Sequence, residues 1–261
     1  MDVTKQFEIS KYKNGEAETV SDSVVVEYSL TVFLGGEELI TMLCTPKALK
    51  ALVVGFLHSE GIIEAREDIL EVFICEEDGI ALVTLTKERA ALVEKLDVKR
   101  TITSGCAKGL TIYSGAEQMP QRIEKGITIE YEKVLKLVGQ FNKMSEIFLE
   151  TGGVHSCALC TQDEIVLFEE DIGRHNALEK IFGAAMIDDI NLEDKMILTS
   201  GRVSSEIIGK AAKRGIGAIV SRSAPTDAAI DIARALGLVL IGFARGQRLN
   251  VYSQREKEMH I

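Results

Sequence analysis

Apolar and polar residues alternate in the first third of the chain in the way that half-buried strands require. The runs VVVEYSLTVFL and EELITML flank Gly35-Gly36, and the runs EVFIC and IALVTLT flank a turn at Asp78-Gly79. Because glycine supports the tight turns that join antiparallel strands, each pair of runs predicts a β-hairpin, the first over residues 24–43.

A helix is predicted between the two hairpins. Thr45 is suited to cap it and Pro46 to lie in its first turn, and apolar residues then recur at helical spacing up to Gly61. Those apolar residues are Leu49, Leu52, Val53 and Phe56. Hairpins and helix together predict a small α+β domain over residues 1–96.

The pattern changes after residue 96. Residues 97–127 carry scattered glycines among polar residues with no sustained period, which predicts a connecting loop. Beyond it the predicted helices cover residues 134–148, 174–182, 204–214 and 226–236, and the predicted strands cover residues 154–160, 164–169, 195–199, 217–221, 238–243 and 249–253. Strands separated by helices favour a largely parallel sheet covered on both faces, so we expect an α/β domain over residues 128–261.

Composition and charge narrow the class of protein. The chain has 261 residues, of which 46% are hydrophobic, and no apolar run approaches the roughly 20 residues of a membrane span. Its first ten residues lack the features of a signal peptide, and five cysteines are too few for a disulfide framework. These features predict a soluble, cytoplasmic protein with reduced thiols. The net charge of −10 argues against nucleic acid or an anionic membrane as a partner.

Positive charge gathers near the predicted strand ends of the second domain. Residues 201–250 contain eight Lys or Arg and three acids, a local balance of +5. Because parallel strands end at one edge of a sheet, the arginines that follow them should share a rim. These arginines are Arg174, Arg202, Arg222, Arg245 and Arg248. Guanidinium groups and helix N-termini suit phosphate oxygens, so we predict a phosphate-bearing ligand there; solvated loop arginines are the alternative.

Four of the five cysteines are expected to be structural. Cys44 precedes the first predicted helix and Cys75 lies in an apolar strand, and both should be in the core. His155, Cys157 and Cys160 are spaced like metal ligands, but alternation along a strand would turn Cys160 away from the other two. The sequence also lacks the H-x-E and P-C-x-x-C elements of zinc deaminases. We therefore expect no metal site and no bound zinc.

Cys106 has a different setting. Glycines flank it in the segment Thr103-Ser104-Gly105-Cys106-Ala107-Lys108-Gly109. A thiol that meets successive partners must be accessible, and a nearby lysine favours the thiolate, which is the form that attacks sulfur. Cys106 is therefore the candidate nucleophile, and an incidental loop cysteine is the alternative.

A series of short motifs occurs in order between about residue 24 and residue 253. The motifs are Cys44-Thr45-Pro46, Gly55-Phe56, Glu60-Gly61-Ile62-Ile63, Thr103-Ser104-Gly105-Cys106, Thr151-Gly152-Gly153-Val154-His155, Gly173-Arg174-His175-Asn176-Ala177, Ser200-Gly201-Arg202, Ser223-Ala224-Pro225-Thr226 and Gly242-Phe243. As a set they resemble the FdhD family, the sulfurtransferases required for formate dehydrogenase activity. So many motifs in one order are far more specific than any one of them.

The resemblance implies a fold and a chemistry. Residues 128–261 would form a cytidine-deaminase-like three-layer α/β domain without that superfamily's zinc, preceded by the smaller N-terminal α+β domain. Cys106 would accept sulfur as a persulfide from a cysteine desulfurase and pass it to the molybdenum bis(molybdopterin guanine dinucleotide) cofactor, before that cofactor enters the formate dehydrogenase catalytic subunit. The family's cofactor-contacting segment corresponds here to Phe243, Ala244, Arg245, Gly246, Gln247 and Arg248.

One position departs from the family pattern. Members often carry a Cys-x-x-Cys pair in the thiol loop, whereas Gly109 stands three residues after Cys106. A second loop thiol cannot then resolve the persulfide, so sulfur leaves Cys106 directly, or the protein works as a non-catalytic chaperone that binds the cofactor and docks on apo-formate dehydrogenase. A metal-dependent deaminase of the same fold is a third alternative, and the sequence leaves a homodimer open.

Overall fold

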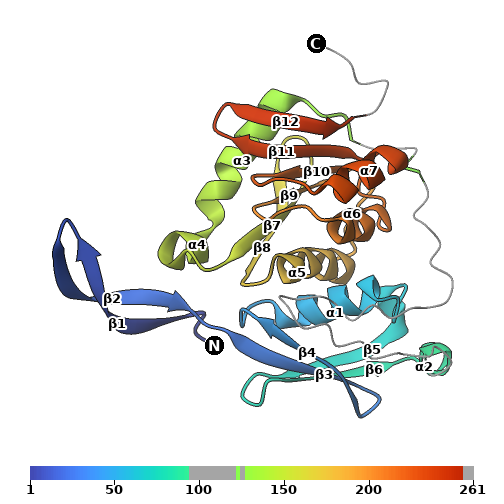
Figure 1. Ribbon diagram of the computed structural model, residues 1–261. Helices are drawn as coiled ribbons and strands as arrows, with labels where there is room; N and C mark the ends of the chain where they lie inside the picture. Colours follow the sequence, from blue (N-terminus) through green and yellow to red (C-terminus); the bar gives the residue numbers. More distant parts are fainter. Residues whose placement is uncertain (94–121, 124–126, 255–261) are drawn as a thin grey trace.

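The structure is a computed structural model that describes residues 1–93, 122–123 and 127–254 (Figure 1). The described N-terminal part holds β1 (Thr4–Lys13), β2 (Glu16–Val25), β3 (Tyr28–Leu34), β4 (Glu37–Cys44), α1 (Leu49–Ser59), the 3-10 turn η1 (Arg66–Asp68), β5 (Ile69–Cys75), β6 (Ile80–Leu85) and α2 (Lys87–Val93). The described C-terminal part holds α3 (Tyr131–Met144), α4 (Glu146–Thr151), β7 (His155–Cys160), β8 (Ile165–Asp171), α5 (Arg174–Ile187), β9 (Met196–Thr199), α6 (Ser205–Ala212), β10 (Ala218–Ser221), α7 (Asp227–Leu236), β11 (Val239–Arg245) and β12 (Arg248–Ser253). The protein is thus mixed α/β.

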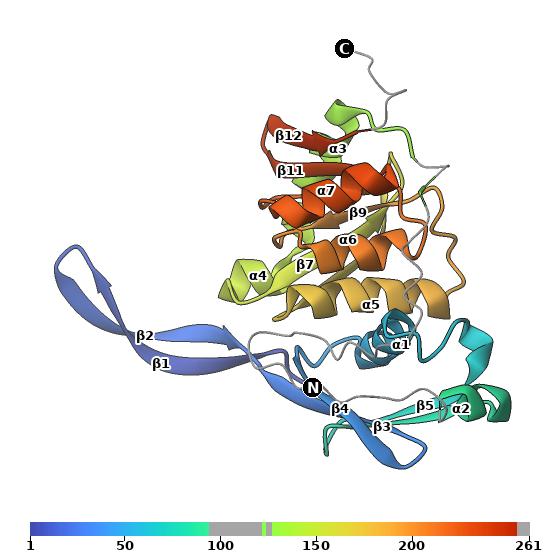
Figure 2. The ribbon, with the colours of Figure 1, turned by 45° about the vertical axis from the view of Figure 1, so that its right-hand side comes forward.

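Strands β1 and β2 form a long two-stranded ribbon that projects from the body of the molecule (Figures 1 and 2). They are paired in register from Thr4 opposite Val25 to Lys13 opposite Glu16. Asn14 and Gly15 form the turn with φ of 55° and 91°, the left-handed geometry that Asn-Gly hairpin turns require. This hairpin was not predicted, although Asn-Gly is a strong signal for one.

The next four strands form a sheet in the order β4-β3-β6-β5. Both predicted hairpins are confirmed: β3 pairs antiparallel with β4 across Gly35-Gly36, and β5 pairs antiparallel with β6 across a turn that ends at Gly79. Helix α1 covers one face of this sheet and buries Leu52, Val53 and Phe56 against it. The predicted α+β architecture is therefore present, with α2 as an additional helix.

Thr45 has a different role from the predicted helix cap. Ala48, with φ of 52°, occupies the N-cap position of α1 and makes no side-chain cap hydrogen bond. The Thr45 backbone N–H donates instead to Asp171 Oδ2 at 3.0 Å, and its Oγ1 accepts from the Ile172 N–H at 3.1 Å. Thr45 therefore ties the N-terminal part of the chain to the end of β8.

The C-terminal part is built on a six-stranded sheet in the order β12-β11-β10-β9-β7-β8. Only the pairings of β10 with β9 and with β11 are parallel, so the prediction of a largely parallel sheet is wrong. The connection between β7 and β8, residues 161–164, is too short for a parallel crossover, which needs about a dozen residues. A short connection of this kind forces an antiparallel hairpin.

Helices cover both faces of this sheet, as predicted (Figures 1 and 2). Helices α5, α6 and α7 pack on one face with Cys157 and Leu159 of β7. Helix α3 packs on the other face, where Phe141 meets Phe168 of β8 with ring centroids 5.5 Å apart. The layering within the described residues is helix, sheet, helix, and its assignment as cytidine-deaminase-like stays a prediction.

Helices α1 and α5 join the two parts of the chain by direct backbone packing. A Cβ placed on Gly183 would lie 1.8 Å from the Ala51 carbonyl oxygen, and one on Gly55 would lie 1.9 Å from the Glu179 carbonyl oxygen. Next to this crossing, the fully buried Lys180 ammonium lies 2.7 Å from Asp171 Oδ2 and donates to the Thr45 carbonyl at 3.1 Å. The interface between the two parts therefore has no room for a larger side chain at Gly55 or Gly183.

The predicted domain division into residues 1–96, 97–127 and 128–261 stays a prediction. Residues 94–121 and 124–126 fall outside the described chain, and with them lies Cys106. Within the described ranges, no helix is both long and apolar enough to cross a membrane.

Candidate functional site at the strand ends

The ends of several strands meet at one edge of the six-stranded sheet. Strand β7 runs antiparallel to both of its neighbours, so its first residue, His155, lies opposite Asp171 at the end of β8. Cys157 lies opposite Thr199, the last residue of β9, which brings His155 beside the segment that follows β9. The strand-end rim expected from sequence is therefore completed by the start of an antiparallel strand.

A cavity of about 280 Å³ opens at this edge, and we call it the strand-end cavity. Its lining residues come from α4 and the glycines after it, the start of β7, the segments after β8, β9 and β10, and the end of β11. They are Phe148, Gly152, Gly153, Val154, His155, Ser156, Ile172, Ser200, Arg222 and Arg245. The cavity combines a small apolar wall with two arginines.

Arg222 and Arg245 lie side by side at the cavity. Arg245 Nε donates to the Arg222 backbone carbonyl at 2.8 Å. Burial and then the charge of Arg245 lower the pKa of Arg222 from its ordinary value. No carboxylate of the described residues forms an ion pair with either guanidinium. Two adjacent cations without an acidic partner make a local field that favours an anion.

A third arginine, Arg174, lies in the first turn of α5 behind the cavity lining, close to Gly201 and His155. Its Nε is buried and has no hydrogen-bond partner among the described residues. A Cβ on Gly201 would lie 3.0 Å from the Arg174 Cβ, so the glycine allows the segment after β9 to pass close to the arginine. An unsatisfied buried donor next to a cavity is a feature that a bound anion would explain.

His155 and Ser200 supply neutral hydrogen-bonding groups. His155 Nδ1 and Ser200 Oγ lie 3.4 Å apart. Burial, followed by the charge of Arg174, lowers the pKa of His155 below its ordinary value of 6.5. The imidazole is therefore neutral at pH 7 and can hydrogen-bond to a ligand without adding charge.

The remaining predicted residues lie around the cavity without lining it. Arg202 is exposed after β9, and Arg248 opens β12 on the far side of the turn that contains Gly246 and Gln247. Phe243 adopts φ of 51° and donates its N–H to the Ser223 carbonyl at 3.1 Å. Ala244 is fully buried in the core beneath α3. Of the predicted segment 243–248, Arg245 is the residue that lines the cavity.

Sequence reasoning missed His155 and Ser200 as site residues. The sequence presents His155 as a candidate metal ligand because of its spacing from Cys157 and Cys160. The short connection between β7 and β8 contains the missing signal, since it makes β7 antiparallel and moves its first residue to the rim. The antiparallel direction of β7 also brings Gly152 and Gly153, which directly precede this strand, to the wall of the cavity.

Three of the four cysteines in the described chain are poor nucleophiles. Burial raises the pKa of Cys44 and of Cys160 to about 12, and it raises that of Cys157 as well. A buried thiol of this kind stays protonated at neutral pH. The prediction that Cys75 lies in the core is wrong. Its side chain is half-buried, and its Sγ donates to Asp78 Oδ2 at 3.2 Å.

The predicted geometry of the candidate metal motif is confirmed. Cys157 packs in the core beneath α5, whereas Cys160 packs beneath α3 on the opposite face of the sheet. The two sulfurs therefore cannot bind one ion. Among the residues that the structure describes, no three His, Cys, Asp or Glu side chains gather in a way that could hold a metal.

Fold and site define a mixed α/β protein with a basic cavity at the strand ends. The model of the FdhD/NarQ family matches residues 25–259, and the chain belongs to this family, as its motifs predicted. The chain is similar to the sulfur carrier protein FdhD of Bacillus licheniformis, with 41% identity over 256 residues that cover 98% of this chain and 97% of that protein. It is also similar to the sulfur carrier protein FdhD of Listeria monocytogenes serotype 4b, with 42% identity over 264 residues that cover 98% and 99%.

A solved structure supports the fold. The crystal structure named as that of a formate dehydrogenase accessory protein from Desulfotalea psychrophila superposes with a TM-score of 0.77. Its sequence is 22% identical, and the match covers 98% of this chain and 99% of that one. The arrangement of both parts of the chain is thus shared with that protein.

Proposed function

We propose that this protein is a sulfurtransferase that carries persulfide sulfur from a cysteine desulfurase to the molybdenum bis(molybdopterin guanine dinucleotide) cofactor, and that formate dehydrogenase requires this step. Membership of the FdhD/NarQ family and relatives named sulfur carrier proteins support the sulfur chemistry. The observation that carries the cofactor assignment is the strand-end cavity, where Arg222 and Arg245 lie without acidic partners. We place the reaction in the cytoplasm, with the formate dehydrogenase catalytic subunit as the final partner.

Sulfur loading is an exchange at a disulfide-like bond. The Cys106 thiolate attacks the terminal sulfur of the desulfurase persulfide, a new S–S bond forms at Cys106, and the desulfurase cysteine leaves as a thiolate. No net electrons are transferred in this step. The high pKa values of Cys44 and Cys160, and the raised pKa of Cys157, exclude these thiols from the attacking role at neutral pH.

Release of the sulfur has a further requirement. Delivering the terminal sulfur as sulfide breaks the S–S bond and consumes two electrons. Because Gly109 occupies the position of a second loop cysteine, these electrons must come from a thiol reductant other than this loop.

The cofactor enters as a substrate, and the pyrophosphate of each of its two dinucleotides is a strongly anionic group. Arg222 and Arg245 line the cavity from two different segments and can share the phosphate oxygens, and Arg174 adds its positive charge from the first turn of α5. His155 and Ser200 offer neutral hydrogen bonds beside them. The exposed Arg202 and Arg248 stand outside the cavity and would contact the parts of the cofactor that extend beyond it.

Arginine substitutions at the cavity test the cofactor assignment. Arg245→Ala or Arg222→Ala is expected to weaken binding of guanosine diphosphate by about 1.5–3 kcal/mol, because each removes a charge-assisted hydrogen bond. Titration calorimetry at two salt concentrations measures this, and affinity should fall as salt rises. Arg234→Ala is the matched control, since Arg234 bonds to the Tyr252 carbonyl away from the cavity. Equal weakening by all three variants would reject the site.

The alternative is a non-catalytic chaperone that binds the cofactor and docks on apo-formate dehydrogenase. Gly109, which removes the second loop thiol, is the observation that favours it. Both functions require the strand-end cavity, but only sulfur transfer requires Cys106. A Cys106→Ser protein that binds guanosine diphosphate normally therefore distinguishes the two functions. The chaperone would still activate formate dehydrogenase, and the sulfurtransferase would not. A homodimer stays a prediction for either function.

A further inference from the structure

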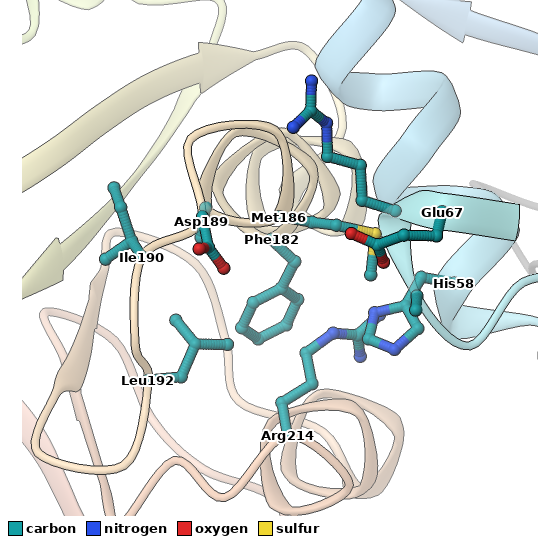
Figure 3. Close-up of a pocket in the computed structure, with 11 residues that line it drawn as sticks. His58, Glu67, Phe182, Met186, Asp189, Ile190, Leu192 and Arg214 are labelled. Carbon is teal, nitrogen blue, oxygen red and sulfur yellow. The ribbon is translucent and has the colours of Figure 1, made fainter. Parts of the chain in front are cut away.

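A second cavity, drawn in Figure 3, lies where the N-terminal and C-terminal parts of the chain meet. It has a volume of about 310 Å³, and we call it the junction cavity. Residues of α1 and η1 line one side, and residues of α5 and of the segments that precede β9 and β10 line the other. Because the strand-end cavity is built from segments that follow β9 and β10, the two cavities lie at opposite edges of the six-stranded sheet.

The inner end of the junction cavity offers hydrogen-bond donors. The Arg214 guanidinium carbon lies 4.2 Å from the centroid of the Phe182 ring. Its Nη1 donates to the Lys210 carbonyl at 2.9 Å and its Nη2 to Ser59 Oγ at 2.8 Å, whereas its buried Nε has no partner in the described chain. The guanidinium therefore has donors left over from the protein's own hydrogen bonds.

His58 stands next to this guanidinium (Figure 3). Burial, with the charge of Arg214, lowers the pKa of His58 to about 4. The imidazole is then neutral at pH 7 and can add a neutral N–H donor beside the cation. A carboxylate is a group that such a pair of donors accommodates.

The mouth of the cavity has the opposite character. Glu67 and Asp189 are exposed lining residues from different parts of the chain, and Arg66 is an exposed basic residue of the same lining. Figure 3 places the Asp189 carboxylate and the Arg214 guanidinium on different sides of the Phe182 ring. Met186 and Leu192 complete an apolar wall. The lining of the cavity thus combines hydrogen-bond donors, carboxylate acceptors and an apolar wall beside them.

We propose that the junction cavity binds a free α-amino acid with an apolar side chain. The carboxylate would accept from Arg214 and His58, the ammonium would donate to Asp189 and Glu67, and the side chain would pack on Met186 and Leu192. A volume of 310 Å³ stands near the lower end of the range of about 300–1,000 Å³ for small-molecule sites. This site shares no lining residue with the strand-end cavity, and a ligand in it touches both parts of the chain.

Titration calorimetry of the full chain with each of the twenty amino acids tests the proposal. We expect saturable binding of leucine or methionine, and binding at least about tenfold weaker for the two leucine analogues that lack one charge, 4-methylpentanoate and leucinamide. Asp189→Asn should weaken leucine binding by about tenfold and leave 4-methylpentanoate binding unchanged, since only leucine carries the ammonium. Asp188→Asn is the matched control, an exposed neighbour that does not line the cavity.

Three results would overturn the proposal. The first is that none of the twenty amino acids saturates the protein at millimolar concentration. The second is that 4-methylpentanoate or leucinamide binds as tightly as leucine, which would remove the recognition of both charges. The third is that Asp189→Asn and Asp188→Asn have equal effects. Guanosine diphosphate binding, measured on the same samples, is expected to be unaffected in every case. Failure of the amino-acid proposal would therefore not count against the proposed function.

Discussion

Replacing Cys106 with serine is expected to abolish sulfur uptake from a cysteine desulfurase. Serine cannot form a persulfide, and buried Cys44, Cys157 and Cys160 have raised pKa values, so no buried thiol can substitute for it at neutral pH. Intact-mass measurement after incubation with the desulfurase and cysteine should show the gain of sulfur fall by more than about 100-fold. The fold should be unchanged by circular dichroism.

Cys75→Ser is the matched control for this result. Cys75 is the one cysteine of the described residues that is not fully buried, and its bond to Asp78 involves an exposed turn. We expect the Cys75→Ser protein to load sulfur at the normal level. Full formate dehydrogenase activity in cells that carry only the Cys106→Ser protein would show that sulfur does not pass through this residue, and the chaperone function would then be favoured.

Gly183→Ala is expected to cause the largest loss of stability. The added methyl group would lie 1.8 Å from the Ala51 carbonyl oxygen and 2.7 Å from the Gly55 nitrogen, and both are backbone atoms that cannot rotate away. Helices α1 and α5 must then separate, which costs more than about 3 kcal/mol in the free energy of unfolding. The midpoint of urea denaturation measures this loss.

Gly139→Ala provides the matched comparison for Gly183→Ala. Gly139 is also a helical glycine, but a Cβ placed there meets no atom within 4 Å. Alanine at this position should raise the stability by about 0.5–1 kcal/mol, because it restricts the unfolded chain. Equal denaturation midpoints for the two variants would mean that the α1–α5 contact is not as tight as the structure describes.

Local sequence patterns predicted most of the elements, because those elements depend on near neighbours. The hairpin across Gly35-Gly36 and the amphipathic helix that buries Leu52 and Phe56 are examples. Errors arose where a signal was present and went unused. The Asn14-Gly15 turn indicated the N-terminal ribbon, and residues 161–164 were too few to connect parallel strands.

The remaining features depend on contacts between distant residues, which no local pattern contains. Thr45 looks like a helix cap until its bonds to Asp171 and Ile172 are known, more than 100 residues away. Likewise Arg174, Arg222 and Arg245 were predicted to share a rim, whereas the neutral pair of His155 and Ser200 beside them depends on the direction of β7. The sequence therefore indicates the charge at the strand-end cavity better than its shape.

The contact between α1 and α5 also limits how the protein can evolve. Gly55 and Gly183 each give up the space of a side chain to the backbone of the opposite helix, so neither position accepts a larger residue while the other helix stays in place. A chimaera that took its first 93 residues from one relative and the rest from another would fit only if both glycines were inherited together. Recombination between relatives should therefore preserve these two helices as a matched pair.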